Sequence, residues 1–338
     1  MNFAIIGFGG LGKLHFRNVA EVAKRTGDIQ LVAICDVNEQ AFKTETKTNL
    51  GGNDAGYDLS QYHLYTDVKE LFKKEKLDFV ITALPTHLHE KVAVQAMERG
   101  IHVFSEKPMA LNVEQAEHML KAAKENHVKL MIGQCVRYFP EYVMLKEFVD
   151  SQKFGKVIRA DFTRISPTIG WSWQDWMLDE TKSGGAVLDL HVHDVDFIQW
   201  VFGMPKAISS VATNYKSKHE FISTVYEYDD VLVTATSDWS MPAGFSFAAG
   251  FTVRFEKAAI IKNAEGIKCY PEEGEPYLLE VPVVNGYVEE VVDFIHCIRE
   301  NKESDINPPE ASFRSLQIAL AEKMAADNGK MKELSYNA

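Results

Sequence analysis

The chain has 338 residues, 46% hydrophobic and 25% charged, a balance typical of a globular protein of about two domains. Its formal net charge of -12 and sequence pI near 5.4 argue against a basic face, so we expect neither nucleic acid nor an anionic membrane surface as a partner. No window approaches the roughly 18 apolar residues of a membrane span, and no signal-peptide pattern is present. The four cysteines form no CxxC pair, so we expect reduced thiols and a cytoplasmic protein.

Short apolar runs alternate with amphipathic runs over the first 130 residues, and this predicts a parallel sheet with right-handed helical crossovers. The glycine-rich stretch 51–56 predicts a surface loop. The predicted strands are 2–6, 29–35, 79–82, 101–104 and 129–132, and the predicted helices begin near residues 11, 38, 67, 87 and 113.

The pattern changes after about residue 135, where runs of β-branched and aromatic residues follow one another between turn signals. Strands that follow strands predict a largely antiparallel sheet and an α+β second domain. The predicted strands are 157–165, 207–215, 223–228, 231–238, 246–255 and 258–262, with helices at 141–151, 287–299 and 310–327.

The motif Gly7-Phe8-Gly9-Gly10-Leu11-Gly12 follows the first predicted strand and opens a helix. In a GxGxxG motif the glycines permit a tight turn, close approach to a pyrophosphate and close helix–strand packing, and the helix N-terminus faces the phosphates. Asp36 ends the second strand and can accept hydrogen bonds from ribose hydroxyls, although it could instead cap a helix. Since Asp36 would repel a 2′-phosphate and neither Val37 nor Asn38 is basic, we expect NAD rather than NADP.

Two later segments carry side chains suited to proton movement at an alcohol carbon. Glu106-Lys107-Pro108 follows a predicted parallel strand, whose carboxyl end should face a ligand crevice. Lys107 could orient a reacting hydroxyl and stabilise developing negative charge, or be a solvated loop lysine. Asp189 and His193 are four residues apart, so on a helix they share one face. His193 could accept the hydroxyl proton while Asp189 positions the imidazole or the substrate.

Other interpretations remain for these segments. His191, His193, Asp194 and Asp196 could bind a metal ion, or could be caps and buried polar contacts. Without another ligand cluster we expect no metal. Trp171-Ser172-Trp173 could stack on a sugar ring, or belong to an aromatic core or a subunit contact.

Taken together, the motifs resemble the glucose–fructose oxidoreductase, inositol dehydrogenase and rhizopine-catabolism (Gfo/Idh/MocA) family over nearly the whole length. The resemblance implies an NAD-binding Rossmann domain over residues 1–130. It also implies an α+β domain over residues 131–338, which binds substrate and forms a homodimer or homotetramer through a large, mostly antiparallel open-faced sheet. The last helices could pack back on the Rossmann domain. The motifs that carry the resemblance are Gly7–Gly12, Pro85 with His89, Glu106-Lys107-Pro108, and Gly184-Gly185 followed by Asp189 and His193.

The resemblance also implies roles for individual residues. Lys107, Asp189 and His193 match the family's catalytic trio, with His193 as the proton acceptor. Leu84, Thr86, Cys135 and His191 depart from common family patterns. The residues expected to bind the cofactor are Gly7, Phe8, Gly9, Gly10, Leu11, Gly12, Asp36, Leu84, Pro85, His89, Glu106 and Lys107. The residues expected to bind substrate are Lys107, Arg137, Tyr138, Trp171, Trp173, Asp189 and His193.

We therefore expect an oxidoreductase that transfers hydride between NAD and a secondary hydroxyl of a sugar or cyclitol, as an inositol dehydrogenase does. Two alternatives remain, a nucleotide-dependent sensor without catalysis and a glycoside-cleaving enzyme that uses bound NAD for transient oxidation.

Overall fold

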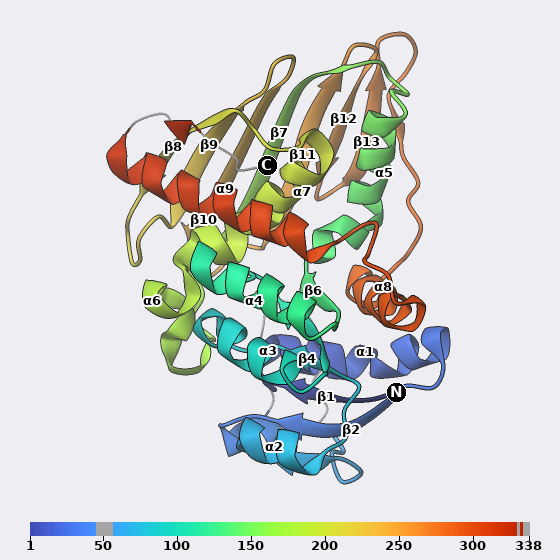
Figure 1. The fold of residues 1–338 in the computed structure, drawn as a ribbon. Coiled ribbons are helices and arrows are strands. Elements are labelled where there is room, and N and C mark those ends of the chain that lie inside the picture. Colours follow the sequence, from blue (N-terminus) through green and yellow to red (C-terminus); the bar gives the residue numbers. More distant parts are fainter. Residues whose placement is uncertain (45–56, 330–331, 334–338) are drawn as a thin grey trace. The chain divides into compact units, whose positions relative to one another are not determined.

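A computed structural model describes residues 1–44, 57–329 and 332–333, so the loop predicted at 51–56 lies outside the described residues. The chain divides into two compact units (Figure 1). The first unit comprises Met1–Cys135, Trp171–Trp176 and Asn285–Phe313, and the second comprises Val136–Gly170, Met177–Val284 and Arg314–Ala338.

The first unit contains a parallel six-stranded sheet in the order β3-β2-β1-β4-β5-β6, the order of a Rossmann fold. The expected doubly wound sheet is thereby confirmed. β3 was missed from the sequence because it has three residues and its burial does not alternate. The strands are β1 (Asn2–Ile6), β2 (Gln30–Cys35), β3 (His63–Tyr65), β4 (Phe79–Thr82), β5 (His102–Glu106) and β6 (Leu130–Gly133).

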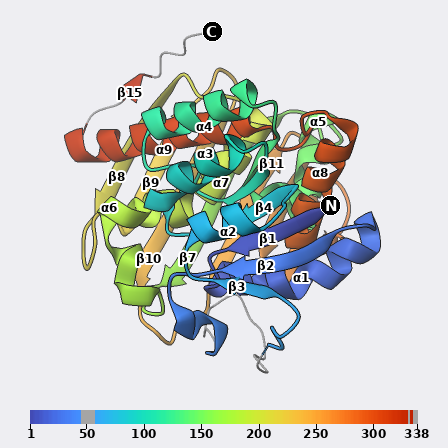
Figure 2. The ribbon, with the colours of Figure 1, turned by 60° about the horizontal axis from the view of Figure 1, so that its bottom comes forward.

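Helices cover both faces of this sheet because its crossovers run in opposite directions from β1 and from β4. α1 packs with α8 on one face, and α3 packs with α4 on the other (Figure 2). The helical elements of this unit are α1 (Gly10–Thr26), η1 (Glu39–Phe42), α2 (Val68–Lys74), η2 (Thr86–Leu88), α3 (His89–Met97), α4 (Val113–Glu125) and α8 (Gly286–Glu300).

The core of the first unit depends on α8, which comes from the far end of the chain. Phe294 of α8 meets the rings of Phe79 and Phe104 edge-on, with 5.8 Å between centroids in both pairs. Val291 and Ile295 are buried in the same cluster. Burying such side chains stabilises a fold by about 1.5–3 kcal/mol each, so α8 is an integral part of this unit.

The second unit is built on a sheet that has nine strands among the described residues, in the order β14-β13-β12-β11-β7-β10-β9-β8-β15. All neighbouring pairs are antiparallel except β7 with β10, which confirms the predicted, largely antiparallel sheet. The strands are β7 (Val157–Pro167), β8 (Ala207–Thr213), β9 (Phe221–Glu227), β10 (Leu232–Met241), β11 (Ala248–Phe255), β12 (Ala258–Asn263), β13 (Gly266–Pro271), β14 (Tyr277–Leu278) and β15 (Lys332–Glu333).

One face of this sheet is covered by helices, while the other face is partly exposed. Phe197 of α7 stacks edge-on against Tyr142 of α5 and Phe162 of β7, at 4.9 and 5.7 Å between centroids. On the other face Val225 and Leu232 are about half exposed. The remaining helical elements are η3 (Cys135–Tyr138), α5 (Pro140–Asp150), η4 (Trp173–Leu178), α6 (Glu180–Ser183), η5 (Val187–His191), α7 (Val192–Phe202) and α9 (Pro309–Asn328).

Candidate active site

The glycine motif forms the turn between β1 and α1, and two of its glycines have no room for a side chain. A Cβ on Gly7 would lie 2.2 Å from the carbonyl oxygen of Ala83, and Gly7 has a φ of +92°. A Cβ on Gly12 would lie 1.9 Å from the carbonyl oxygen of Gly7. By contrast, nothing lies within 4 Å of the Cβ position of Gly9. The open space at Gly9, directly before the N-terminus of α1, fits the approach of a dinucleotide pyrophosphate.

Asp36 lies against the same turn. Its Oδ2 accepts the backbone N–H of Phe8 at 2.6 Å, and its Oδ1 accepts the N–H of Asn38 at 2.8 Å. The cap of the following η1 is Asn38 rather than Asp36. Each carboxylate oxygen retains a further lone pair, so Asp36 can still accept ribose hydroxyls. The ring of Phe8 is fully buried among aromatic rings, so Phe8 can meet a cofactor only through its backbone.

The loop after β4 contains Leu84 and Pro85, both partly exposed at the carboxyl edge of the sheet. His89 is fully buried, with Nε2 2.8 Å from the carbonyl oxygen of Leu84 and Nδ1 2.8 Å from that of Pro108. Burial lowers the pKa of His89, and a neutral imidazole donates to only one of these carbonyls. His89 therefore lies between the loops that follow β4 and β5, contacts the backbone of both and donates a hydrogen bond to one of them.

Lys107 follows β5 and is the single partly exposed residue between positions 103 and 110. Its backbone N–H donates to Oε2 of Glu106 at 3.3 Å. The Glu106 side chain points into the protein, where Oε1 is 2.6 Å from Nε2 of His15. Lys107 is therefore accessible at the carboxyl edge of the sheet. The side chain of Glu106 points inward and supports the Lys107 turn through the backbone N–H of Lys107.

Asp189 and His193 lie in one continuous helical segment of the second unit. η5 is a π-helical turn, and α7 follows it directly. Between positions 183 and 199, Asp189 and His193 are the two partly exposed residues, and the others are buried. The two side chains therefore share the accessible face of this segment, and π-helical turns are frequent at functional sites.

Buried ion pairs hold α7 from behind. Arg137 donates from Nε and Nη2 to the two carboxylate oxygens of Asp196, at 2.7 and 2.9 Å. Arg164 donates in the same way to Asp194, at 3.1 and 2.9 Å. Removal of one partner from such a buried pair costs several kcal/mol, so these contacts fix the helix that carries His193. The sequence interpretation of Asp194 and Asp196 as buried polar contacts is confirmed.

His191 takes part in a separate buried network. Its Nδ1 lies 2.7 Å from Oγ of Ser237, and its Nε2 lies 3.3 Å from Oε1 of Glu322 in α9. Tyr226 also donates to Oε1 of Glu322, at 2.5 Å. This network ties η5 to β9, β10 and α9, so His191 is another of the expected polar contacts.

Four of the residues expected to bind substrate, Arg137, Tyr138, Trp171 and Trp173, differ in how far they are exposed. Arg137 is 1% exposed, and the ion pair with Asp196 uses its guanidinium. Tyr138 is also buried. Trp171 is partly exposed and Trp173 is 50% exposed, and both belong to the segment that clusters with the first unit.

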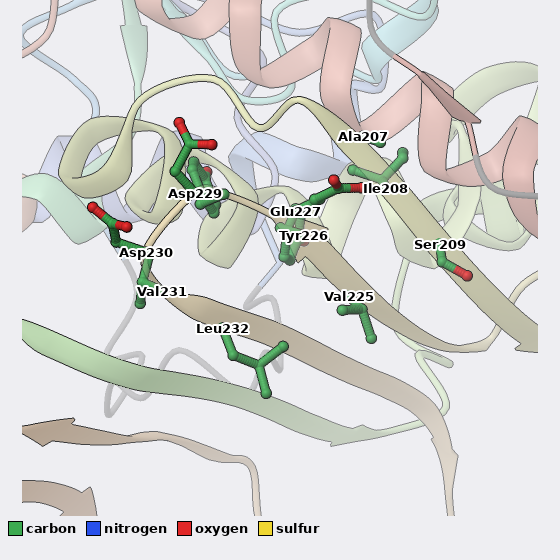
Figure 3. Close-up of a pocket in the computed structure, with 11 residues that line it drawn as sticks. Ala207, Ile208, Ser209, Val225, Tyr226, Glu227, Asp229, Asp230, Val231 and Leu232 are labelled. Carbon is green, nitrogen blue, oxygen red and sulfur yellow. The ribbon is translucent and has the colours of Figure 1, made fainter.

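A hollow of about 540 Å³ lies elsewhere in the second unit, along β8, β9 and β10 (Figure 3). Its lining includes Glu227, Asp229 and Asp230 but none of the residues that the sequence predicts for catalysis. A buried cluster of His15, Glu106 and Glu290 was not predicted from the sequence, and among the described residues it is the group that could hold a metal ion.

Two family descriptions match the chain. That of an oxidoreductase family with an NAD-binding Rossmann fold matches residues 1–134, and that of the GFO/IDH/MocA C-terminal domain matches residues 142–261. The chain therefore belongs to the GFO/IDH/MocA oxidoreductase family, as the motifs predicted. No helix in the ranges 1–44, 57–329 and 332–333 is both long and apolar enough to cross a membrane.

Several relatives are named for activities on sugars or inositols. The 2,7-anhydro-N-acetylneuraminate hydratase of Mediterraneibacter gnavus is 26% identical over 238 residues, which cover 69% of this chain and 57% of the relative. The myo-inositol 2-dehydrogenase of Thermotoga maritima is 30% identical over 206 residues, 60% of this chain and 55% of the relative. The inositol 2-dehydrogenase of Rhizobium meliloti is 24% identical over 288 residues, which cover 85% of this chain and 80% of the relative. The chain spans little more than half the length of the first two.

Solved structures of similar fold cover almost the whole chain. Levoglucosan dehydrogenase in complex with NADH and levoglucosan has a TM-score of 0.82 at 17% identity and covers 98% of this chain and 99% of its own. An aldose-aldose oxidoreductase from Caulobacter crescentus, complexed with glycerol, has a TM-score of 0.80 at 20% identity and covers 99% of both chains. At these identities the likeness concerns the fold.

Proposed function

We propose that this protein is an NAD-dependent dehydrogenase that oxidises a secondary hydroxyl of a sugar or cyclitol. One observation carries the proposal. In two otherwise buried segments, the side chains left accessible are the ones that the chemistry needs, Lys107 in the first unit and Asp189 with His193 in the second. The family's NAD-binding fold and its inositol dehydrogenases support the reaction class.

The proposed reaction removes two hydrogens from the secondary alcohol: the hydrogen on carbon leaves as hydride, and the hydrogen on oxygen leaves as a proton. NAD, when bound, supplies the hydride acceptor. His193 takes the hydroxyl proton as the carbonyl forms, and Asp189 orients the imidazole or a neighbouring hydroxyl. Lys107 donates a hydrogen bond to the reacting oxygen and stabilises the negative charge that develops there. The proton then passes from His193 to solvent, which restores His193 as a proton acceptor.

The structure supports NAD over NADP through Asp36. Its carboxylate lies beside the glycine turn, where a 2′-phosphate would meet a second negative charge, and the following Val37 is 70% exposed and apolar. We expect Asp36→Ser to narrow the preference for NAD over NADP by about tenfold, a change of about 1.4 kcal/mol. Competition titrations with both reduced cofactors measure this, and an unchanged preference would contradict the assignment.

Substitution of the proposed catalytic side chains tests the reaction. Lys107→Met and His193→Asn should each lower kcat by about 10²- to 10⁴-fold while NADH still binds, because general acid–base groups contribute that much. Lys124→Met and His296→Asn are matched controls at exposed helix positions and should keep wild-type turnover. Turnover is first sought by screening NAD reduction across inositols, aldoses, sugar acids and amino sugars.

A double-mutant cycle tests whether the two residues act on the same oxygen. If Lys107 and His193 both contact the reacting hydroxyl, the double variant should lose much less activity than the product of the two single losses. If the loss of activity in the double variant equals the product of the two single losses, the two side chains act independently, and a common site is refuted.

A second candidate reaction is transient oxidation without net release of NADH, as in a glycoside-cleaving enzyme. The similarity to a 2,7-anhydro-N-acetylneuraminate hydratase favours this candidate, because a hydratase reaction involves no net redox change. Product analysis combined with the absorbance of reduced nicotinamide separates the two. Product formed without stoichiometric NADH would favour this candidate over the dehydrogenase.

We also propose a homodimer or homotetramer that works in the cytoplasm. The partly exposed face of the nine-stranded sheet supports the first proposal, since Val225 and Leu232 lie about half exposed on it. The four cysteines are buried and form no disulfide, which supports a reducing compartment. Light scattering on Val225→Glu and on the wild type tests the assembly, and a wild-type monomer would contradict it.

A further inference from the structure

Three ionisable side chains meet inside the first unit, on α1, β5 and α8. They are His15, Glu106 and Glu290, each at most 3% exposed, and their ligating atoms lie within 4.8 Å of one another. Glu106 is the centre of the cluster, because one of its oxygens faces His15 and the other accepts the backbone N–H of Lys107. A single carboxylate thus connects the helix of the glycine motif to the turn that carries Lys107.

Glu290 is the unexplained member of this cluster. It is fully buried, and neither of its carboxyl oxygens has a hydrogen-bond partner among the described residues. Burial, followed by the charge of Glu106, raises the pKa of Glu290 well above its ordinary value. Two carboxylates in one buried site cannot both ionise without a large cost, because both desolvation and mutual repulsion oppose the second charge.

Within the described part of the chain, burial and Glu106 are the causes that shift the pKa of Glu290, and no lysine or arginine is among them. α1 contributes His15, β5 contributes Glu106, and the chain after β6 contributes Cys135. On α8 itself Tyr287 is a neighbouring titratable group, and its pKa is raised by Cys135, by burial and by both glutamates. Asp293, one turn further along α8, accepts a hydrogen bond from Ser304. The ion pair of Arg25 with Glu289 is partly exposed.

The spacing inside the cluster favours a proton over a metal ion as the group that neutralises it. Nε2 of His15 and Oε1 of Glu106 are 2.6 Å apart, which is a hydrogen-bond distance. Two ligands of one zinc ion, each at about 2.0–2.1 Å, would be about 3.3 Å apart at a tetrahedral angle. The His15–Glu106 contact therefore already uses the atoms that a metal would need.

We propose that Glu290 is a neutral carboxylic acid at physiological pH and acts as a positioning residue for the turn that holds Lys107. While Glu290 keeps its proton, Glu106 is the single anion of the cluster and can hold both His15 and the Lys107 amide. When Glu290 ionises at alkaline pH, two carboxylates oppose each other, and the link between α1 and the Lys107 turn weakens. The consequence for catalysis rests on the proposed function of Lys107, whereas the protonation of Glu290 does not.

The sign of the stability effect distinguishes a neutral acid from an ionised one. In the unfolded chain Glu290 loses its proton above its ordinary pKa of 4.5, while in the folded protein it keeps the proton to higher pH. The wild type therefore loses stability as pH rises from that value to the raised folded pKa, by up to tenfold in the folding equilibrium per pH unit. Glu290→Gln carries no proton to lose, so its stability relative to wild type should rise with pH.

The experiment compares denaturant unfolding of wild type, Glu290→Gln and Glu289→Gln from about pH 5 to about pH 9. Glu289→Gln is the matched control, because it is the adjacent residue of α8, partly exposed and paired with Arg25. We expect Glu290→Gln to gain on the wild type progressively above pH 5, and the control to show no such gain. If Glu290→Gln is unstable at every pH, Glu290→Met repeats the test with an apolar side chain, and loss of folding in both overturns the proposal.

A second measurement reads the positioning role. NADH affinity and kcat of the wild type should fall together on the alkaline side, and Glu290→Gln should lack that fall. Stabilisation of wild type but not of Glu290→Gln by Zn²⁺ or Mn²⁺ would overturn the neutral acid in favour of a metal site. If instead the stability trend appears while Lys107→Met keeps full turnover, Glu290 is neutral as proposed and the assignment of Lys107 fails.

Discussion

Adding one methyl group at Gly12 or at Gly9 should separate the packing role of the glycine motif from its binding role. At Gly12 the new Cβ would lie 1.9 Å from the carbonyl oxygen of Gly7, well inside the 3.4 Å at which ordinary contact begins. The obstacle is backbone at the start of the same motif, so β1 and α1 must move apart. At Gly9 the same methyl enters open space, and its φ of -78° suits alanine.

Gly12→Ala should lower the stability of the fold, whereas Gly9→Ala should lower the affinity for NADH. Overpacking of this sort costs about 1–3 kcal/mol, and at about 2–4 °C per kcal/mol Gly12→Ala should lower the melting temperature by roughly 2–12 °C. Gly9→Ala loses a favourable N-cap residue but also restricts the unfolded chain, and these effects of up to about 1 kcal/mol nearly cancel. Its methyl group, however, occupies the space proposed for the pyrophosphate, so NADH affinity should fall by about 10- to 100-fold.

Thermal unfolding and fluorescence titration with NADH measure the two effects on the same preparations. Gly244→Ala is the matched control, because its Cβ also enters open space, but in the turn between β10 and β11. It should change neither quantity. Normal NADH affinity in Gly9→Ala would place the dinucleotide elsewhere, and an undiminished melting temperature in Gly12→Ala would refute the packing argument.

Further predictions concern buried ionisable groups. Arg137→Met should destabilise the protein by about 3–5 kcal/mol in denaturant unfolding, because Asp196 is left buried without its cation, and a loss below about 1 kcal/mol would contradict this. Burial lowers the folded pKa of His89, so the unfolded chain binds a proton before the folded protein does, and the free energy of unfolding decreases as pH falls below about 6.5. His89→Gln should reduce this dependence of stability on pH, and an equal dependence in the two proteins would refute the prediction. Burial raises the pKa of Cys35 and of Cys297 to about 12, so thiol reagents should label both slowly in the native protein and rapidly after denaturation, and fast native labelling seen by mass spectrometry would contradict this.

The two sheets could be predicted from the sequence because their strands carry strong local patterns. The buried strands of the first unit appear as short apolar runs, and those of the second alternate with turn signals. Asp189 and His193 could be placed on one face from their spacing alone. The π-helical turn that contains Asp189 was not predicted, because it depends on tertiary packing rather than on local propensity.

The partners of buried charges were beyond the reach of local patterns. Arg137 and Asp196 are 59 positions apart, and no spacing rule connects them. Glu290 did leave a signal, since it falls on the buried stripe of α8 with Gly286, Phe294 and Cys297. An acidic residue on an apolar stripe indicates an unusual environment, although its neighbour His15 becomes visible only in the fold.

The contribution of α8 to the first core has a consequence for biosynthesis. The ribosome releases the chain in order, so residues 1–135 emerge about 150 residues before α8 begins at Gly286. At about 5–20 residues per second this is an interval of roughly 8–30 seconds, during which Phe79 and Phe104 lack the ring that later covers them. The nascent N-terminal segment is therefore a natural client for chaperones. A chimaera that transplants this segment between relatives without its distant helix should aggregate.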